Sequence, residues 1–188
     1  FGSSDAIGLE ARVANAFSAV GLYVWKTFVP AGLCAFHPHP ALAEPPRGPW
    51  SPGVLAGLAL LLGASVMLVA WRRRAPAALV GWLWFLGMLV PVLGLVQVGL
   101  QGWAERYTYL PSVGLGLALV WGVDSLATGI LARRAALACG LAALVALSLA
   151  SARQIGVWRD TPRLLAHALE VDESDVAHVN LARALEAT

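Results

Sequence analysis

The stretch from Leu79 to Pro111 reads LVGWLWFLGMLVPVLGLVQVGLQGWAERYTYLP and decides the class of fold. Its first two-thirds consists almost entirely of Leu, Val, Gly and aromatic residues, and it is long enough to cross a bilayer at about 20 residues per span. Glu105 and Arg106 then stand together, before two tyrosines and a second apolar run. A charge pair between two apolar runs belongs at the boundary between membrane and water. The stretch therefore predicts a membrane span that ends in charge.

The composition of the whole chain also indicates an integral membrane protein. Of its 188 residues, 59% are hydrophobic and only 13% are charged, with a mean hydropathy of +0.70. A soluble domain carries roughly 25% charged residues. The net charge of +2 comes from basic residues in short clusters between apolar runs, which form no continuous basic stripe. We therefore expect a membrane lipid environment and no nucleic-acid partner.

Hydrophobic runs predict an all-α, polytopic transmembrane helix bundle with about four to five spans. The first helix holds a clean apolar part, Val13 to Trp25, that is shorter than a usual span, so either a crossing or an interfacial position is open. Pro91 is expected to kink the third helix. The expected helices cover residues 10–35, 53–71, 77–101, 110–131 and 135–151.

From Arg153 onward the chain becomes polar and amphipathic. Leucines and alanines at helical spacing predict two helices joined by the turn-like sequence VDESD. We therefore expect a membrane domain over residues 1–152 and a helical segment over residues 153–188. A single helical pair of this kind cannot bury its apolar face, so we expect further repeats after Thr188. The alternative is a lone amphipathic hairpin. Trp158, near the start of the segment, is expected to have a structural role, packed against its first helix or the membrane rim.

Three stretches resemble one known family. They are VGLYVWKTFVPAGLCAFHPHP at residues 20–40, GWLWFLGMLVPVLGLVQVG followed by ERYTYLP at residues 81–111, and QIGVWRDTPRLLAHALEV at residues 154–171. In this order they are similar to bacterial relatives of the transmembrane and tetratricopeptide-repeat O-mannosyltransferases. The family's motif begins Asp-Arg-Tyr where this chain has Glu105. The helical pair after residue 153 would then be the start of a tetratricopeptide (TPR) domain.

The resemblance implies a membrane glycosyltransferase with no cofactor. Such an enzyme moves a sugar, here mannose, from a polyprenyl phosphate to a hydroxyl of an acceptor protein recruited by the repeats, or of another acceptor. The family's catalytic Asp lies in an early non-cytoplasmic loop that this sequence lacks, so we expect the chain, which begins with Phe1, to be a piece of a longer protein. The competing hypothesis is a membrane-anchored TPR scaffold without enzymatic activity. A transporter is disfavoured because Asp124 is nearly alone among polar residues in the spans.

The candidate site lies at the charged end of the central span. On the resemblance, Arg106 binds the donor phosphate with Tyr107 and Tyr109 beside it, since a guanidinium can grip a phosphate with two hydrogen bonds. The alternative is an interfacial anchor, with the tyrosines in an aromatic belt and the arginine snorkelling to water. Glu105 is a weaker candidate for a catalytic base, because Arg106 beside it should keep it ionised and occupied.

His37 and His39 lie in a proline-rich loop and are candidates for the rim of the site. Histidines two residues apart can ligate a metal, but no further Cys or His is expected to complete the set, and Glu44 is the only close carboxylate. We therefore expect turn-forming histidines at the membrane rim and no metal.

The basic clusters predict the orientation of the chain. Arg72 to Arg74 and Arg133-Arg134 are separated by two spans and so share one face, which the positive-inside rule makes cytoplasmic. The histidine loop, Glu105-Arg106 and residues 153–188 then lie on the periplasmic or external face, and the membrane is expected to be a bacterial inner membrane. Asp124 lies about two helical turns from Arg133, so we expect it to have a structural role near the interface.

Overall fold

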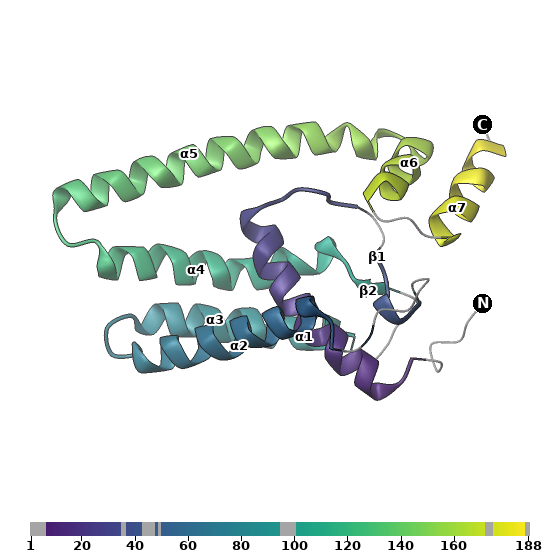
Figure 1. Cartoon of the computed structure of the whole chain (residues 1–188). Coiled ribbons are helices and arrows are strands. Elements are labelled where there is room, and N and C mark those ends of the chain that lie inside the picture. The colour runs from purple at the N-terminus through teal and green to yellow at the C-terminus, as the bar shows by residue number, and fades with distance from the viewer. Residues whose placement is uncertain are drawn as a thin grey trace.

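The computed structural model is a bundle of helices with a second, smaller helical pair at its C-terminal end (Figure 1). It describes residues 7–34, 37–42, 48, 50–94, 101–171 and 175–186. The elements in chain order are α1 (Leu9–Phe28), β1 (His37–Pro38), η2 (Pro40–Leu42), α2 (Pro52–Ala70), α3 (Pro76–Leu89), η3 (Val90–Val92), β2 (Gln101–Trp103), η4 (Glu105–Thr108), α4 (Tyr109–Leu126), α5 (Ile130–Ile155), η5 (Val157–Arg159), α6 (Thr161–Val171) and α7 (Asp175–Glu186).

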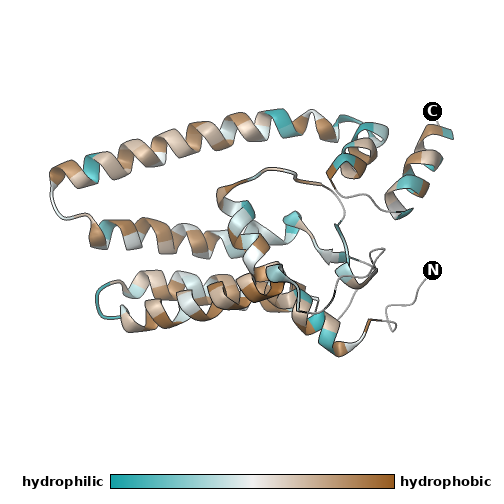
Figure 2. Cartoon of the chain, viewed as in Figure 1, coloured by the Kyte–Doolittle hydropathy of each residue, from teal (hydrophilic) through white to brown (hydrophobic). Residues whose placement is uncertain are grey.

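Among the described residues, three helices are long and apolar enough to cross a membrane, which indicates membrane association. They are Pro52–Ala70, Glu105–Leu126 and Ile130–Ile155, and Pro76–Val92 is a shorter apolar helix. Hydrophobic residues dominate these helices along their length, whereas α6 and α7 alternate between polar and apolar (Figure 2). No residue of α5 is buried against the rest of the chain. Helix α1, which lies obliquely across the bundle in Figure 1, is not among the three.

Glycines let the helices of the bundle cross closely. A Cβ at Gly81 of α3 would lie 2.3 Å from the Gly114 carbonyl oxygen of α4 and 2.7 Å from the Ala118 backbone nitrogen. Likewise, a Cβ at Gly57 of α2 would lie 2.0 Å from the Phe17 carbonyl oxygen of α1. Small residues at such crossings let backbones approach and gain van der Waals contact where lipid offers no hydrophobic driving force. The α3–α4 and α1–α2 pairs are accordingly the most extensively packed in the fold.

The buried core gathers aromatic residues from α1, α3 and the segment before α4. Tyr23, Phe85 and Leu89 are fully buried, and Trp82 and Trp103 nearly so. The Tyr23 hydroxyl oxygen accepts a hydrogen bond of 3.2 Å from the Ala104 backbone N–H, a distant partner in sequence. The core thus fixes the segment preceding α4 against α1.

Two prolines end helices earlier than their apolar runs suggest. Helix α1 ends at Phe28 and not at residue 35, because the residue before Pro30 is disfavoured in the α conformation. The kink expected at Pro91 is wrong: α3 ends at Leu89, and Pro91 lies in the short helical turn η3. The expected residues 95–100 of this span lie outside the described residues.

The connection between α4 and α5 also differs from expectation. Helix α4 ends at Leu126 and α5 begins at Ile130, after Gly129 at a φ of 97°. Arg133 and Arg134 therefore lie in the first turns of α5 and not between two spans. Arg133 Nη2 is 3.6 Å from Asp124 Oδ1, both side chains being well exposed. The ion pair agrees with a structural role for Asp124.

A small two-stranded sheet lies within the mostly helical fold, which agrees with the all-α expectation. β1 and β2 pair in antiparallel fashion, with His37 opposite Trp103 and Pro38 opposite Gln101. The histidine loop, expected only to turn, is thus tied to the segment preceding α4. Glu44 of this loop lies outside the described residues.

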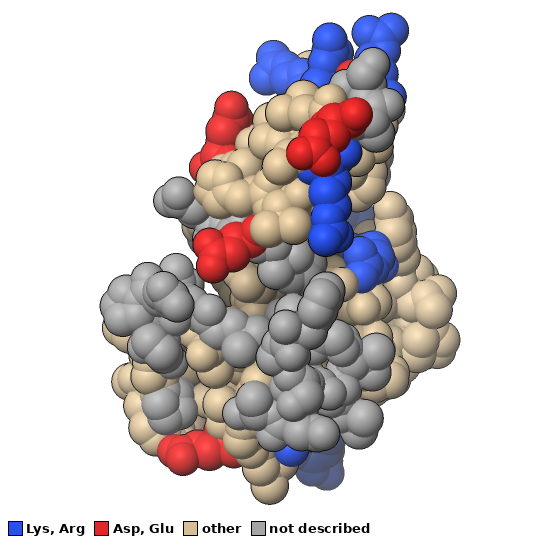
Figure 3. Space-filling model, turned by 90° about the vertical axis from the view of Figure 1, so that its right-hand side faces the viewer, with Lys and Arg blue, Asp and Glu red and all other residues tan. Residues whose placement is uncertain are grey.

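The two ends of the bundle differ in what they carry. The α2–α3 turn, which contains Arg72 to Arg74, and the α4–α5 connection lie at one end, while β1, β2, α6 and α7 lie at the other (Figure 1). Figure 3 looks at this second end, and acidic and basic side chains gather in its upper part, where α6 and α7 lie. The helical pair α6–α7 packs together as the sequence predicts.

Candidate functional site

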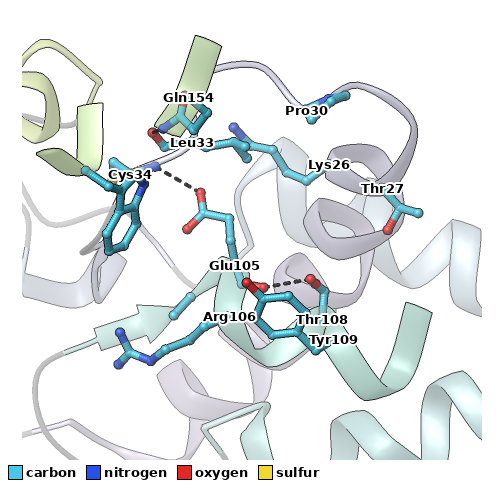
Figure 4. Close-up of a pocket in the computed structure, with 12 residues that line it drawn as sticks. Lys26, Thr27, Pro30, Leu33, Cys34, Glu105, Arg106, Thr108, Tyr109 and Gln154 are labelled. Atoms are coloured by element: carbon cyan, nitrogen blue, oxygen red, sulfur yellow. Dashed lines mark hydrogen bonds between the residues drawn. The ribbon is translucent and has the colours of Figure 1, made fainter. Parts of the chain in front are cut away.

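A cavity of about 360 Å³ lies at the end of the bundle where α1 and α5 end and α4 begins. Three segments far apart in sequence line it, so the cavity is created by the fold and not by a local motif. Its lining residues are Lys26, Thr27, Pro30, Leu33, Cys34, Ala104, Glu105, Arg106, Thr108, Tyr109, Gln154 and Trp158 (Figure 4).

Glu105 is held by the histidine loop and not by its neighbour Arg106. His37 Nε2 donates a hydrogen bond of 2.9 Å to Glu105 Oε1, and the Cys34 backbone N–H donates to the same oxygen at 3.2 Å. The side chain of His37 is 5% exposed and that of Glu105 is 21% exposed. The carboxylate is therefore anchored through one oxygen at the edge of the cavity.

His37 is protonated at neutral pH in this arrangement. Burial opposes protonation, but hydrogen bonds with Cys34 and Glu105 outweigh burial and raise the pKa of His37 to about 9. Its ring also stacks on Trp103, with centroids 3.8 Å apart and planes 11° apart. His37 and Glu105 thus form a partly buried ion pair.

His39 does not line the cavity. Its ring is 1% exposed and its Nδ1 accepts a hydrogen bond from the Ala41 backbone N–H at 3.2 Å, while burial lowers its pKa. Of the two histidines, only His37 is brought to the site.

Arg106 lies at the cavity with a mostly neutral set of contacts. Its Nη2 donates to Gln101 Oε1 at 3.0 Å, and its guanidinium lies 5.2 Å from the centre of the Tyr107 ring. The side chain is exposed, so further N–H groups of the fork remain open to a ligand. Tyr107 itself packs against the hydrophobic core, whereas Tyr109 is 78% exposed and lines the cavity.

Lys26 is a second cation at the cavity, and we did not predict it as a site residue from the sequence. It is half-buried on α1, and its ammonium donates to the carbonyl oxygens of Ala31 and Gly32, the latter at 2.8 Å. It also lies 5.8 Å from the centre of the Trp103 ring. In Figure 4 the Glu105 carboxylate lies between Lys26 on one side and Arg106 on the other. The sequence does contain a signal for this site residue, because a lysine that interrupts an apolar helix indicates a functional position.

The C-terminal segment is hydrogen-bonded to the wall of the cavity at the Leu33 carbonyl group. The Leu33 oxygen accepts a hydrogen bond from Gln154 Nε2 at 3.2 Å and another from His167 Nε2 at 3.1 Å. Trp158 lines the cavity with 57% of its surface exposed, while the η5 turn that carries it packs against α6. The indole therefore borders the cavity.

Cys34 completes a cluster that the sequence interpretation overlooked. Its Sγ is 3.4 Å from His37 Nε2, although the residue stands only three positions before His37. Among the residues that the structure describes, no group of three or more His, Cys, Asp and Glu side chains has an arrangement that could hold a metal ion. The described residues of the site supply two cations, a carboxylate, an imidazole, a thiol and hydrogen-bond donors.

Comparisons with protein-family models, with curated proteins and with solved structures find no match for this chain.

Proposed function

We propose that this chain is part of a membrane glycosyltransferase that moves a sugar, mannose by the resemblance, from a polyprenyl phosphate to a hydroxyl acceptor. The observation that carries the proposal is the cavity at the end of apolar helices, with Lys26 and Arg106 in its wall. A phosphate on an isoprenoid chain places its charge at such a boundary and its tail among the helices. Cations there neutralise the phosphate that leaves when the sugar is transferred.

The distribution of charge supports a non-cytoplasmic position for the cavity. The cluster Arg72 to Arg74 lies at the opposite end of the bundle, and arginine clusters mark the cytoplasmic side of membrane proteins. The cavity and the α6–α7 pair then face the periplasm or the outside, where an acceptor protein held by TPR helices would meet the donor. The catalytic base is assigned to no residue of this chain.

The test is transfer by the full-length protein from mannosyl and glucosyl polyprenyl phosphates. Arg106→Lys and Arg106→Ala should each lower the rate about ten- to a hundredfold, since a charged hydrogen bond of this kind contributes about 1.5 to 3 kcal/mol. Lysine does not rescue the rate because an ammonium cannot reproduce the two-pronged grip. Arg73→Lys and Arg73→Ala, at the opposite end of the bundle, are the matched controls.

Wild-type rates and donor dependence in both Arg106 variants would leave Arg106 as an interfacial anchor. Absence of any transfer by the full-length protein, together with binding of proteins by its C-terminal segment, would favour the scaffold hypothesis. The packed pair α6–α7 is the feature on which that second hypothesis rests.

A further inference from the structure

Helix α1 starts at the end of the bundle to which the chain after it returns. In Figure 1, α1 begins near the end that carries β1 and β2 and runs obliquely inward, and the chain after Phe28 leads back to that end. The Asn15 amide donates a hydrogen bond of 2.6 Å to the Gly102 carbonyl oxygen, and the Tyr23 hydroxyl bonds the Ala104 N–H. Both halves of α1 are therefore tied to the segment that precedes α4.

The contact with α2 shows how far α1 reaches into the bundle. A Cβ at Gly21 of α1 would lie 3.1 Å from the Gly57 Cα. The buried residues of α2 are Val54 and Gly57, both within the first two turns of this helix. From Pro52, where α2 begins, to Gly57 is about 8 Å along the helix axis, whereas a hydrocarbon core is about 30 Å thick. Helix α1 thus meets α2 well before the middle of the span.

The turn at the tip of α1 has its carbonyl groups bonded by a side chain of the same helix. Gly32 lies in the left-handed region, with a φ of 59°, where the chain reverses. The Lys26 ammonium donates to the carbonyl oxygens of Ala31 and Gly32. The Ala31 N–H donates to the Val29 carbonyl oxygen at 2.8 Å. The turn therefore does not depend on water for these hydrogen bonds.

The chain that returns from this turn is irregular, and distant side chains satisfy its backbone. The Leu33 carbonyl oxygen accepts hydrogen bonds from Gln154 and His167, and the Cys34 N–H donates to Glu105. Non-helical backbone is tolerated at membrane depth where the protein supplies such partners. Residues 29–34 meet this requirement through α1, η4, α5 and α6.

The tip of α1 exposes apolar side chains and turns its polar groups inward. Trp25 and Phe28 are 60% and 52% exposed, and residues three apart share one face of a helix. The Thr27 hydroxyl donates to the Tyr23 carbonyl oxygen at 2.8 Å, and Lys26 bonds the turn. Aromatic side chains are enriched where headgroups meet hydrocarbon. The exposed face at the tip therefore suits lipid and not water.

We infer that residues 9–34 form a re-entrant element, which enters one leaflet from the cavity side of the membrane and returns to that side without crossing. Trp25 and Phe28 contact the hydrocarbon of this leaflet. Lys26 holds the turn at the tip of the element. The inference concerns the membrane and not the reaction, so it stands or falls independently of sugar transfer.

Cysteine labelling of the full-length protein in intact cells tests whether α1 crosses. In a background of Cys34→Ser and Cys139→Ser, single cysteines replace Glu10, Gly48 and Arg73, which are all exposed. Glu10→Cys and Gly48→Cys should react alike with an impermeant maleimide, whereas Arg73→Cys should react in the opposite way. Equal reactivity of the first two supports the inference whichever side they face. Opposite reactivity of Glu10→Cys and Gly48→Cys would mean that α1 crosses and would overturn it.

Spin labels measure the depth of the tip in liposomes, from collisions with oxygen and with a water-soluble nickel chelate. Leu62 of α2 is 56% exposed and lies about 15 Å along the helix from Pro52, near the centre of a bilayer, so it is the reference. A label at Phe28 should be protected from nickel and lie between the labels at Glu10 and Leu62. Equal depth at Glu10 and Phe28 would overturn the re-entrant element in favour of a helix that lies along the surface. A Phe28 label deeper than Leu62 would also overturn it.

A variant of Lys26 tests how the turn is held. Lys26→Met should move the Phe28 label towards water, because the Ala31 and Gly32 carbonyl groups then require water as a donor, whereas Lys26→Arg should keep its depth. The Leu62 label should stay at the same depth in both variants, which shows that the bundle is intact. An unchanged depth of the Phe28 label in Lys26→Met would overturn the role of Lys26 at the turn.

Discussion

Replacing Gly81 by Ala tests whether the α3–α4 crossing holds the bundle together. A Cβ at this position would lie 2.3 Å from the Gly114 carbonyl oxygen, about 1 Å short of the 3.4 Å at which ordinary contact begins. The obstructing atoms belong to backbone and cannot rotate away, so the helices must part. Overpacking of this kind costs about 1 to 3 kcal/mol. Removing a glycine from a helix returns about 0.5 to 1 kcal/mol, so the net change should be a destabilisation of roughly 1 to 2 kcal/mol.

The matched control is Gly87→Ala on the same helix, because nothing lies within 4 Å of a Cβ there. This variant should be neutral or more stable by up to about 1 kcal/mol. Gly114→Ala and Gly116→Ala form the same contrast on α4, since only Gly114 meets backbone of α3. The assay is unfolding in mixed micelles of increasing dodecyl sulfate content, followed by circular dichroism. Equal stability of the Gly81 and Gly87 variants would refute the close crossing.

Further predictions concern the ion pair, the orientation and the C-terminal link. The His37–Glu105 pair should stabilise the fold fully at about pH 6.5, where Glu105, whose pKa, despite burial, is lowered by His37, is ionised, and lose this effect as the pH rises through about 9, because folding raises the pKa of His37 between these values. This increase in the pKa of His37 corresponds to on the order of 3 kcal/mol in the free energy of unfolding. His37→Gln should make the free energy of unfolding depend less on pH in this range, and an unchanged slope would contradict the ion pair. Cysteine placed at exposed Asn180 should react with an impermeant maleimide in intact cells while one at Arg73 is protected, in a background without the native cysteines, and the opposite pattern would reverse the proposed orientation. His167→Ala should increase hydrogen exchange of α6 while leaving α2 unaffected, and equal exchange would mean that the Leu33 link does not hold the segment.

The helical architecture could be predicted largely from hydrophobic runs, and the errors cluster at prolines and glycines. An apolar run states that a segment prefers lipid, but it does not state where the backbone leaves the helix. Pro91 follows an unbroken apolar run and Pro30 follows a mostly apolar one, and both lie just beyond the end of an α-helix. The α4–α5 connection at Gly129 could not be located because Leu126 and Ile130 on its two sides are both apolar.

The site could be predicted only where its residues are neighbours in sequence. Glu105 and Arg106 mark it because they are charges at the end of an apolar run. Their expected partnership was the natural local choice, yet Glu105 pairs with His37, 68 positions away. This pairing depends on the register of β1 and β2. One of these strands lies in a proline-rich loop and the other just before a helix, and both are too short to be recognised from the sequence. The position of Lys26 also depends on tertiary structure, because the crossing of α1 over the bundle brings this residue to the cavity.

Helix α5 and the α3–α4 pair are constrained by different properties of their sequences. At Gly81 the neighbouring backbone fixes the size of the residue to within one methyl group. Along α5, where no residue is buried by this chain, the surroundings select for affinity to hydrocarbon and hardly at all for shape. Leu141, Leu144 and Val145 could be exchanged among themselves with little effect on folding. We therefore expect the residues of α5 to vary strongly among relatives while their hydrophobic composition stays the same. In an alignment, this helix would be recognised by its hydropathy and not by sequence identity.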